Sequence, residues 1–111
     1  MRLGFIRAVL VAGIGCAPVA VQAQEEPQNV QVLTELTYKE ITQYMKTVSK
    51  SVGKKCTFCH VEDEFHLDQK EHKVQARDMM KMLKEMNEKY LKGRGTCYMC
   101  HRGTPEPILE P

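Results

Sequence analysis

Apolar residues recur at helical spacing in two separate stretches of this chain. In the first stretch they fall at positions i, i+3, i+4, i+7 and i+11, and they are Ile41, Tyr44, Met45, Val48 and Val52. Thr37 and Glu40 have the T-x-x-E spacing of a capping box, and Gly53 is a typical residue after a helix end. The pattern therefore predicts a helix that starts after Thr37 and ends before Gly53.

A second, longer apolar stripe predicts a helix over about residues 69–92. The stripe consists of Val74, Met79, Met82, Leu83, Met86 and Tyr90. Asp68 and Glu71 have the spacing of a second capping box, and glycines follow at positions 93 and 95. The sequence shows no alternating strand pattern, so it predicts an all-α fold class. The proline-containing tail after residue 103 is expected to be irregular.

The first 23 residues have the features of a secretory signal peptide. Arg2 and Arg7 lie beside an apolar run, residues 8–23, which ends in a small-residue cleavage pattern, VQA. The run is interrupted by Pro18 and is shorter than the roughly 20 residues that a spanning helix needs. A retained membrane anchor is the alternative to cleavage. Lipid attachment at Cys16 is not expected, because it needs a Leu-type residue three positions earlier and Gly13 stands there. We expect a signal peptide over residues 1–23, a flexible lead over 24–35, one domain over 36–105 and a tail over 106–111.

The charge balance argues against nucleic-acid binding, and the small size of the chain indicates that its fold needs additional stabilisation. The 16 basic residues, less Arg2 and Arg7, leave 14 against 14 acidic residues in the mature chain, with no basic block that would indicate nucleic-acid binding. A chain of this size without Trp makes only a small core, and small cores usually need a covalent or metal staple.

Each predicted helix is followed by the same motif, C-x-x-C-H, at residues 56–60 (CTFCH) and 97–101 (CYMCH). This is the attachment signature of a c-type haem: two thiols on one helical turn add to the porphyrin vinyl groups, and the next residue offers an imidazole to the iron. The sequence thus predicts two covalently bound haem c groups. The thiols are Cys56, Cys59, Cys97 and Cys100, and the proximal iron ligands are His60 and His101.

Zinc and disulfides are the competing interpretations. Four-thiolate zinc sites usually separate their two C-x-x-C pairs by about 15–20 residues, whereas 37 residues separate Cys59 from Cys97. Disulfides are chemically allowed in an exported protein. The His that follows each pair favours haem over both.

The ligand on the distal side of each iron decides between electron transfer, which a closed site favours, and reaction with small molecules. Outside the signal peptide and the motifs, the methionines are Met45, Met79, Met80, Met82 and Met86. Met45 stands alone on its helix, eleven residues before Cys56, and is the predicted ligand of the first haem. For the second haem the spacing favours Met86, eleven residues before Cys97, while core filling is the common role of such methionines.

These residues resemble the family of the photosynthetic reaction centre cytochrome c subunit, a tetrahaem protein, and its short relatives. The resemblance covers about residues 38–105. Its carriers are Met45, Gly53, CTFCH, Phe65, Asp68, Lys73, the ARDM string of residues 76–79, Met82, Asn87 and CYMCHRG. In that family a helix Met is the distal ligand, and the Met of the A-R-x-M string ligates the following haem. The resemblance therefore implies Met79 for the second haem, with Met82 and Met86 as alternatives.

The chain also departs from the family's pattern. It has two haem motifs where the subunit has four, so it resembles one half. No His lies between His72 and His101 to supply a bis-His haem, and His66 and His72 are expected at the surface. Arg77 and Arg102 are candidates for binding haem propionates, with an ordinary surface role as the alternative.

The sequence as a whole predicts an exported, periplasmic dihaem electron carrier that is not an enzyme. Its partners are expected to be redox proteins, including membrane-bound electron-transfer complexes, and no nucleic acid is expected. One alternative is a small peroxidase-like haem enzyme or sensor with an open iron site, which carbon monoxide binding distinguishes. Another is a structural or thiol-redox protein without haem.

Overall fold

The computed structural model describes residues 26–111, so the predicted signal peptide lies outside the described residues. The element order is α1 (Tyr38–Val52), a 3-10 turn (Cys56–Phe58), α2 (Glu71–Met86), a π-helical turn (Asn87–Leu91) and α3 (Tyr98–His101). Residues 26–111 contain no strand, only an isolated bridge between Val61 and Glu64. The all-α prediction is confirmed. None of the helices in this range is long and apolar enough to cross a bilayer.

Helix α1 begins and ends where the sequence predicts. Thr37 is its N-cap: the Thr37 hydroxyl accepts from the Glu40 N–H, and the Glu40 carboxylate accepts from the Thr37 N–H at 2.8 Å. This reciprocal pair satisfies two backbone donors that a helix start otherwise leaves without partners. Gly53 ends the helix in the left-handed conformation, with φ at 64°.

The start of helix α2 corrects the second capping-box prediction. Lys70 is the N-cap and makes no side-chain capping bond. The Asp68 carboxylate instead accepts from Lys73 and Arg77, so two cations on the first turns of α2 occupy the group that was expected to cap it. The helix begins at Glu71, two residues after the predicted start.

The C-terminal end of α2 also differs from one uniform helix. The α-helical pattern stops at Met86, and the chain continues as a π-helical turn before Lys92 takes a left-handed conformation. The Asn87 side chain accepts from the Gly95 N–H at 2.7 Å and donates to the Gly95 carbonyl at 3.0 Å. These two bonds fold the segment after the helix back toward α3.

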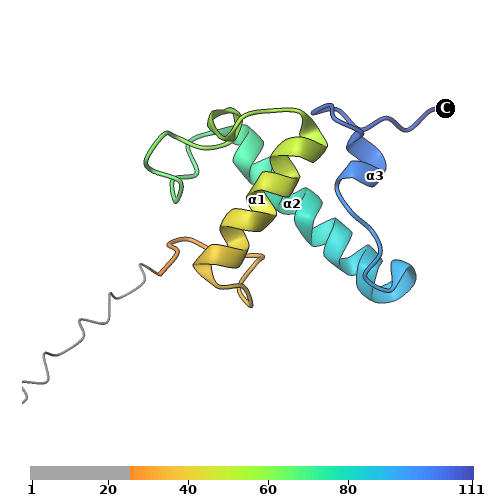
Figure 1. Ribbon diagram of the computed structural model, residues 1–111, viewed down its shortest axis with the longest axis horizontal. Helices are drawn as coiled ribbons and strands as arrows, with labels where there is room; N and C mark the ends of the chain where they lie inside the picture. Colours follow the sequence, from red (N-terminus) through yellow and green to blue (C-terminus); the bar gives the residue numbers. More distant parts are fainter. Residues whose placement is uncertain (1–25) are drawn as a thin grey trace, which may run out of the picture.

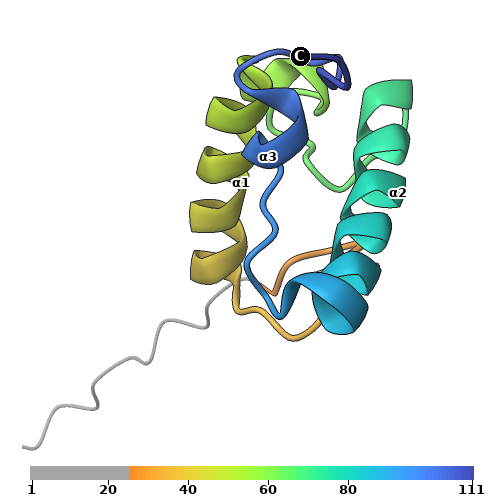
Figure 2. The ribbon, with the colours of Figure 1, turned by 90° about the vertical axis from the view of Figure 1, so that its right-hand side faces the viewer.

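The two helix-plus-motif units interlock. Helices α1 and α2 stand opposite each other, and α3 contacts α1, the helix of the other unit (Figures 1 and 2). The Gly103 N–H, just after the second motif, donates to the Ser51 carbonyl near the end of α1 at 2.8 Å. Ser51 is only 3% exposed. The end of α1 that leads to the first motif is therefore attached to the residue that follows the second.

The polypeptide does not form an apolar core of its own. Within residues 26–111 no apolar side chain is buried, and Val74, Met79 and Met82 of the α2 stripe are 40%, 45% and 50% exposed. Amphipathic helices are normally stabilised by packing their apolar faces against a partner. The apolar faces of the described helices are therefore open to a further apolar group, which is the place that the sequence prediction gives to the haems.

Candidate haem-attachment site

The residues of each motif form a helical turn, which is closed by the same backbone hydrogen bond in both motifs. The His60 N–H donates to the Cys56 carbonyl at 2.9 Å, and the His101 N–H donates to the Cys97 carbonyl at 3.0 Å. The first turn is a 3-10 turn and the second is the short helix α3. Each turn therefore presents two thiols and one imidazole from five consecutive residues.

The two histidines are held in the same way. Nδ1 of His60 lies 3.0 Å from the Phe65 carbonyl oxygen, and Nδ1 of His101 lies 3.0 Å from the Thr104 carbonyl oxygen. A carbonyl oxygen only accepts hydrogen bonds, so Nδ1 carries the proton in both rings and Nε2 keeps its lone pair. Metal-binding histidines typically show this arrangement, in which the second ring nitrogen donates to a carbonyl. The donor set therefore fits an iron ligated through Nε2.

The arrangement of the four cysteine thiols fits haem attachment better than a zinc site. The four cysteines of residues 26–111 are free thiols. Within the same residues no three His, Cys, Asp or Glu side chains gather as a metal site would require. A structural zinc site needs four such ligands around one point. The two pairs remain separate, one in each motif.

The electrostatics of the first motif favour a neutral imidazole. Burial lowers the pKa of His60, and the hydrogen bond to the Phe65 carbonyl opposes that shift. Burial also raises the pKa of the Cys59 thiol, against the attraction of the Lys70 ammonium. Lys70 donates to the Thr57 carbonyl, which places its charge beside the motif. A neutral imidazole is the form that binds a metal.

The second motif has a neighbour from the other unit. Tyr44 of α1 lies against Cys97: burial, and the adjacent Cys97 thiol as the smaller cause, raise the pKa of Tyr44 to about 12. Both residues line a groove of about 540 Å³ between α1, the C-terminal half of α2 and the segment that leads into α3. Met80 also lines this groove. Helix α1, which leads into the first motif, therefore contributes a side chain to the surroundings of the second.

The methionines divide by exposure. Met45, Met80 and Met86 are partly buried, whereas Met79 and Met82 are 45% and 50% exposed. Met80 lines the groove with Cys97, although neither its spacing nor the family resemblance singles it out. The assignments of Met45 and Met79 as distal ligands stay predictions.

The other polar candidates have definite places. His72 is exposed, as expected, and its ring stacks on Phe58 with the ring centroids 4.1 Å apart. His66 is partly buried, which differs from the surface position expected for it. The Arg77 side chain is 12% exposed and binds both oxygens of Asp68, so its guanidinium already has a carboxylate partner. Arg102 is exposed at the end of α3.

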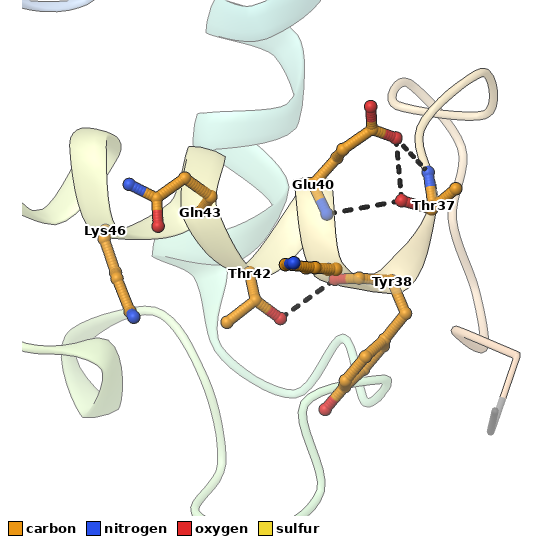
Figure 3. A pocket seen from close by; sticks show the side chains of 7 residues that line it. Thr37, Tyr38, Glu40, Thr42, Gln43 and Lys46 are labelled. Carbon is orange, nitrogen blue, oxygen red and sulfur yellow. Dashed lines mark hydrogen bonds between the residues drawn. The ribbon is translucent and has the colours of Figure 1, made fainter. Parts of the chain in front are cut away.

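A larger hollow, of about 790 Å³, lies away from the motifs at the start of α1. Figure 3 shows that its lining comes from the first turns of α1, including the Thr37–Glu40 capping box. It includes no Cys or His, so it offers no group for haem attachment.

Sequence reasoning missed the atoms that hold the histidines. These are the backbone carbonyls of Phe65 and Thr104. A backbone oxygen has no residue signature, so only the path of the loop after each motif reveals it. The loops differ, because Thr104 lies three residues after its His and Phe65 lies five residues after.

Helical turns that each carry two thiols and an oriented imidazole define the class of c-type cytochromes. A family model described as the photosynthetic reaction centre cytochrome C subunit matches residues 12–109. The chain belongs to this family, which confirms the resemblance seen in the sequence. The members of this family are c-type cytochromes of electron transfer.

Individual relatives agree with the family match. The chain is 38% identical to the photosynthetic reaction center cytochrome c subunit of Thermochromatium tepidum and 35% identical to that of Rubrivivax gelatinosus, over 78% of its own length in each case. It is also 28% identical to cytochrome c-554 of Chloroflexus aurantiacus, over 86% of its length. The chain spans 23–25% of the length of these relatives.

Proposed function

We propose that this protein is an exported dihaem cytochrome c that carries electrons between redox proteins on the outer side of the inner membrane. The observation that supports this most is the repetition of one ligand geometry: in both motifs Nδ1 of the His lies 3.0 Å from a backbone carbonyl. The haems would be held by Cys56 and Cys59 and by Cys97 and Cys100, with Nε2 of His60 and of His101 toward the iron. When bound, each haem supplies one-electron chemistry between the ferric and ferrous states.

The distal ligands in this proposal are Met45 for the first haem and Met79 for the second. A thioether is a neutral, soft donor, and Met/His ligation raises the haem potential. Both residues are mounted on helices, in α1 and α2. A stiff mount keeps the ligand in place between oxidation states, which favours electron transfer over reaction with small molecules.

We confine the proposed partners to redox proteins as a class, which includes membrane-bound electron-transfer complexes. The names of two relatives connect them with the photosynthetic reaction centre. This chain spans about a quarter of those relatives. The proposal therefore assigns electron transfer to this chain and not a particular photosynthetic complex.

Intact mass spectrometry tests haem attachment. The protein is produced in cells that carry a haem-attachment system, and the mature chain should exceed the bare polypeptide by two haem masses. The double variants Cys56→Ser/Cys59→Ser and Cys97→Ser/Cys100→Ser should each lose one haem mass. A bare polypeptide mass in the unaltered protein would refute the proposal. N-terminal sequencing of the periplasmic protein should find a start near Gln24.

Carbon monoxide binding to the reduced protein tests the distal ligands. The unaltered protein should not bind the gas, while Met45→Ala and Met79→Ala should each open one site with both haems still attached. Met80→Ala and Met82→Ala are the matched controls on α2, and they should behave like the parent. Gas binding by Met80→Ala instead of Met79→Ala would reassign the second ligand to the residue in the Cys97 groove. Binding by the unaltered protein would favour the alternative of a haem enzyme or sensor.

A further inference from the structure

The densest polar cluster of the described residues lies at the start of α2. The Asp68 carboxylate accepts from Lys73 at 2.9 Å, from both terminal nitrogens of Arg77 at 2.9 and 3.2 Å, and from the Asn29 amide at 3.0 Å. The Lys73 and Arg77 side chains are only 10% and 12% exposed. We refer to these four residues as the Asp68 cluster. Charge-assisted, bidentate bonds of this kind are strong and geometrically specific.

The Asp68 cluster also holds the loop that follows the first motif. The Asn29 amide donates to the His66 carbonyl at 2.6 Å, and the Lys73 ammonium donates to the Leu67 carbonyl at 2.9 Å. These two carbonyls belong to the residues that directly follow Phe65. The loop is further closed by the Leu67 N–H, which donates to the Glu64 carbonyl at 3.1 Å. The backbone next to Phe65 is therefore fixed from two sides.

The Phe65 carbonyl is the group that accepts from Nδ1 of His60, at 3.0 Å. The Phe65 and His60 rings are also tilted against each other, with centroids 5.3 Å apart. A carbonyl at this position fixes the tautomer and orientation of the ring and raises the basicity of Nε2. Any movement of the loop relative to the motif would lengthen this bond and weaken Nε2 as a donor.

We propose that the Asp68 cluster is a positioning device for His60 that sets the strength of its bond to the first haem iron. This inference rests on the proposed function, because it requires an iron at Nε2. A more basic imidazole stabilises the ferric over the ferrous form, so an intact cluster lowers the potential of the first haem. Asn29 of the N-terminal lead is part of the device, and this gives the lead a role beyond a linker.

Within the part of the chain that the structure describes, the second motif has no equivalent device. Thr104 is held by its immediate neighbours: its N–H donates to the His101 carbonyl at 3.0 Å, and its hydroxyl, which has one hydrogen, lies 2.9 Å from that carbonyl oxygen and 2.7 Å from the Glu106 carbonyl oxygen. Among residues 26–111, no ion pair reaches residues 101–106. The first haem is thus sensitive to the Asp68 cluster and the second is not, which makes His101 an internal control.

The variant Asn29→Gly tests the device without a change of charge. Asn29 has φ at 57°, a conformation that glycine adopts freely, so the substitution removes the amide and leaves the backbone unstrained. Hydrogen exchange of the imidazole Nδ1–H is measured by NMR in the reduced, haem-bearing protein. We expect exchange at least tenfold faster at His60 and unchanged at His101. Lys73→Met should have the same effect, and Lys73→Arg should preserve the parent rate.

The midpoint potential of the first haem is the second measurement. In Asn29→Gly we expect this potential to rise by at least about 28 mV. At 59 mV per tenfold for one electron, that shift corresponds to a threefold change in the ratio of oxidised to reduced haem. Asp78→Asn is the control, because it removes an exposed carboxylate that pairs with Lys81 on the same helix. It should leave both measurements unchanged.

The outcomes separate this inference from the proposed function. If mass spectrometry shows both haems in Asn29→Gly and its His60 exchange and potential equal those of the parent, the positioning role is wrong. If the unaltered protein has no haem on Cys56 and Cys59, the proposed function itself fails and the inference fails with it. Should Lys73→Met fail to fold, Asn29→Gly decides alone, since the side chain it removes belongs to an exposed residue.

Discussion

Replacing Gly53 with alanine should separate the two interlocked units. Gly53 has φ at 64°, and a left-handed conformation costs an L-residue about 1–2 kcal/mol. A Cβ atom at this position would also lie 2.0 Å from the Gly103 carbonyl oxygen and 2.9 Å from the Gly103 carbonyl carbon. Both are backbone atoms, so no side-chain rotation relieves the clash and the two segments must move apart.

That movement would break the bond from the Gly103 N–H to the Ser51 carbonyl, which is 2.8 Å long. Ser51 is 3% exposed, so its carbonyl would lose its partner in a buried place. Leaving a buried acceptor without a partner costs about 1–3 kcal/mol. The total loss expected for Gly53→Ala is therefore about 2–5 kcal/mol.

Gly93→Ala is the matched control. Gly93 has φ at 77°, but a Cβ there meets nothing within 4 Å, so only the conformational cost of about 1–2 kcal/mol applies. Guanidinium unfolding of the haem-bearing protein, followed by far-ultraviolet circular dichroism, gives the free energy of unfolding of both variants. Gly53→Ala should be the less stable by about 1–3 kcal/mol. Equal losses in the two variants would refute the interlock between the end of α1 and Gly103.

Three further predictions follow from the hydrogen bonds and pKa shifts. The cationic partners of Asp68, above all Arg77, hold the pKa of that carboxyl below its ordinary value of 3.8, so the stability that Asp68 contributes is complete above that pH and is lost as the pH falls below it. Asp68→Asn should therefore have a lower free energy of unfolding than the parent at pH 7, and its free energy of unfolding should fall less steeply as the pH is lowered. Parallel plots of the free energy of unfolding against pH for the two proteins would contradict the pairing. Burial, as the main cause, raises the pKa of Tyr44 from its ordinary value of 10.0 to about 12, so ¹³C-tyrosine NMR of the haem-bearing protein should find a phenol that titrates near that pH, and Tyr44→Phe should remove that titration. Thr37→Ala removes the capping box and should lower the free energy of unfolding by about 1 kcal/mol, while Thr34→Ala, outside the helix, should cost less.

The sequence by itself determined the features that depend on local chemistry. A capping box, an apolar stripe and a glycine specified helix α1 to within one residue. The spacing of each C-x-x-C-H motif specified a helical turn with two thiols and an imidazole. These features involve residues within one or two turns of each other, so their pattern can be read along the chain. The same motifs, with the A-R-x-M string, also identified the family correctly.

The tertiary structure decided what depends on distant contacts. The sequence assigned Asp68 to a helix cap, but helix α2 begins after Lys70, so Asp68 lies outside the cap position and its carboxylate accepts from Lys73, Arg77 and Asn29 instead. It also decided that the end of α1 meets Gly103 and that Tyr44 lies beside Cys97. The carbonyls of Phe65 and Thr104 orient the histidines through backbone atoms, which every residue has. Their selection depends on the path of the chain in space, so no residue pattern announces them.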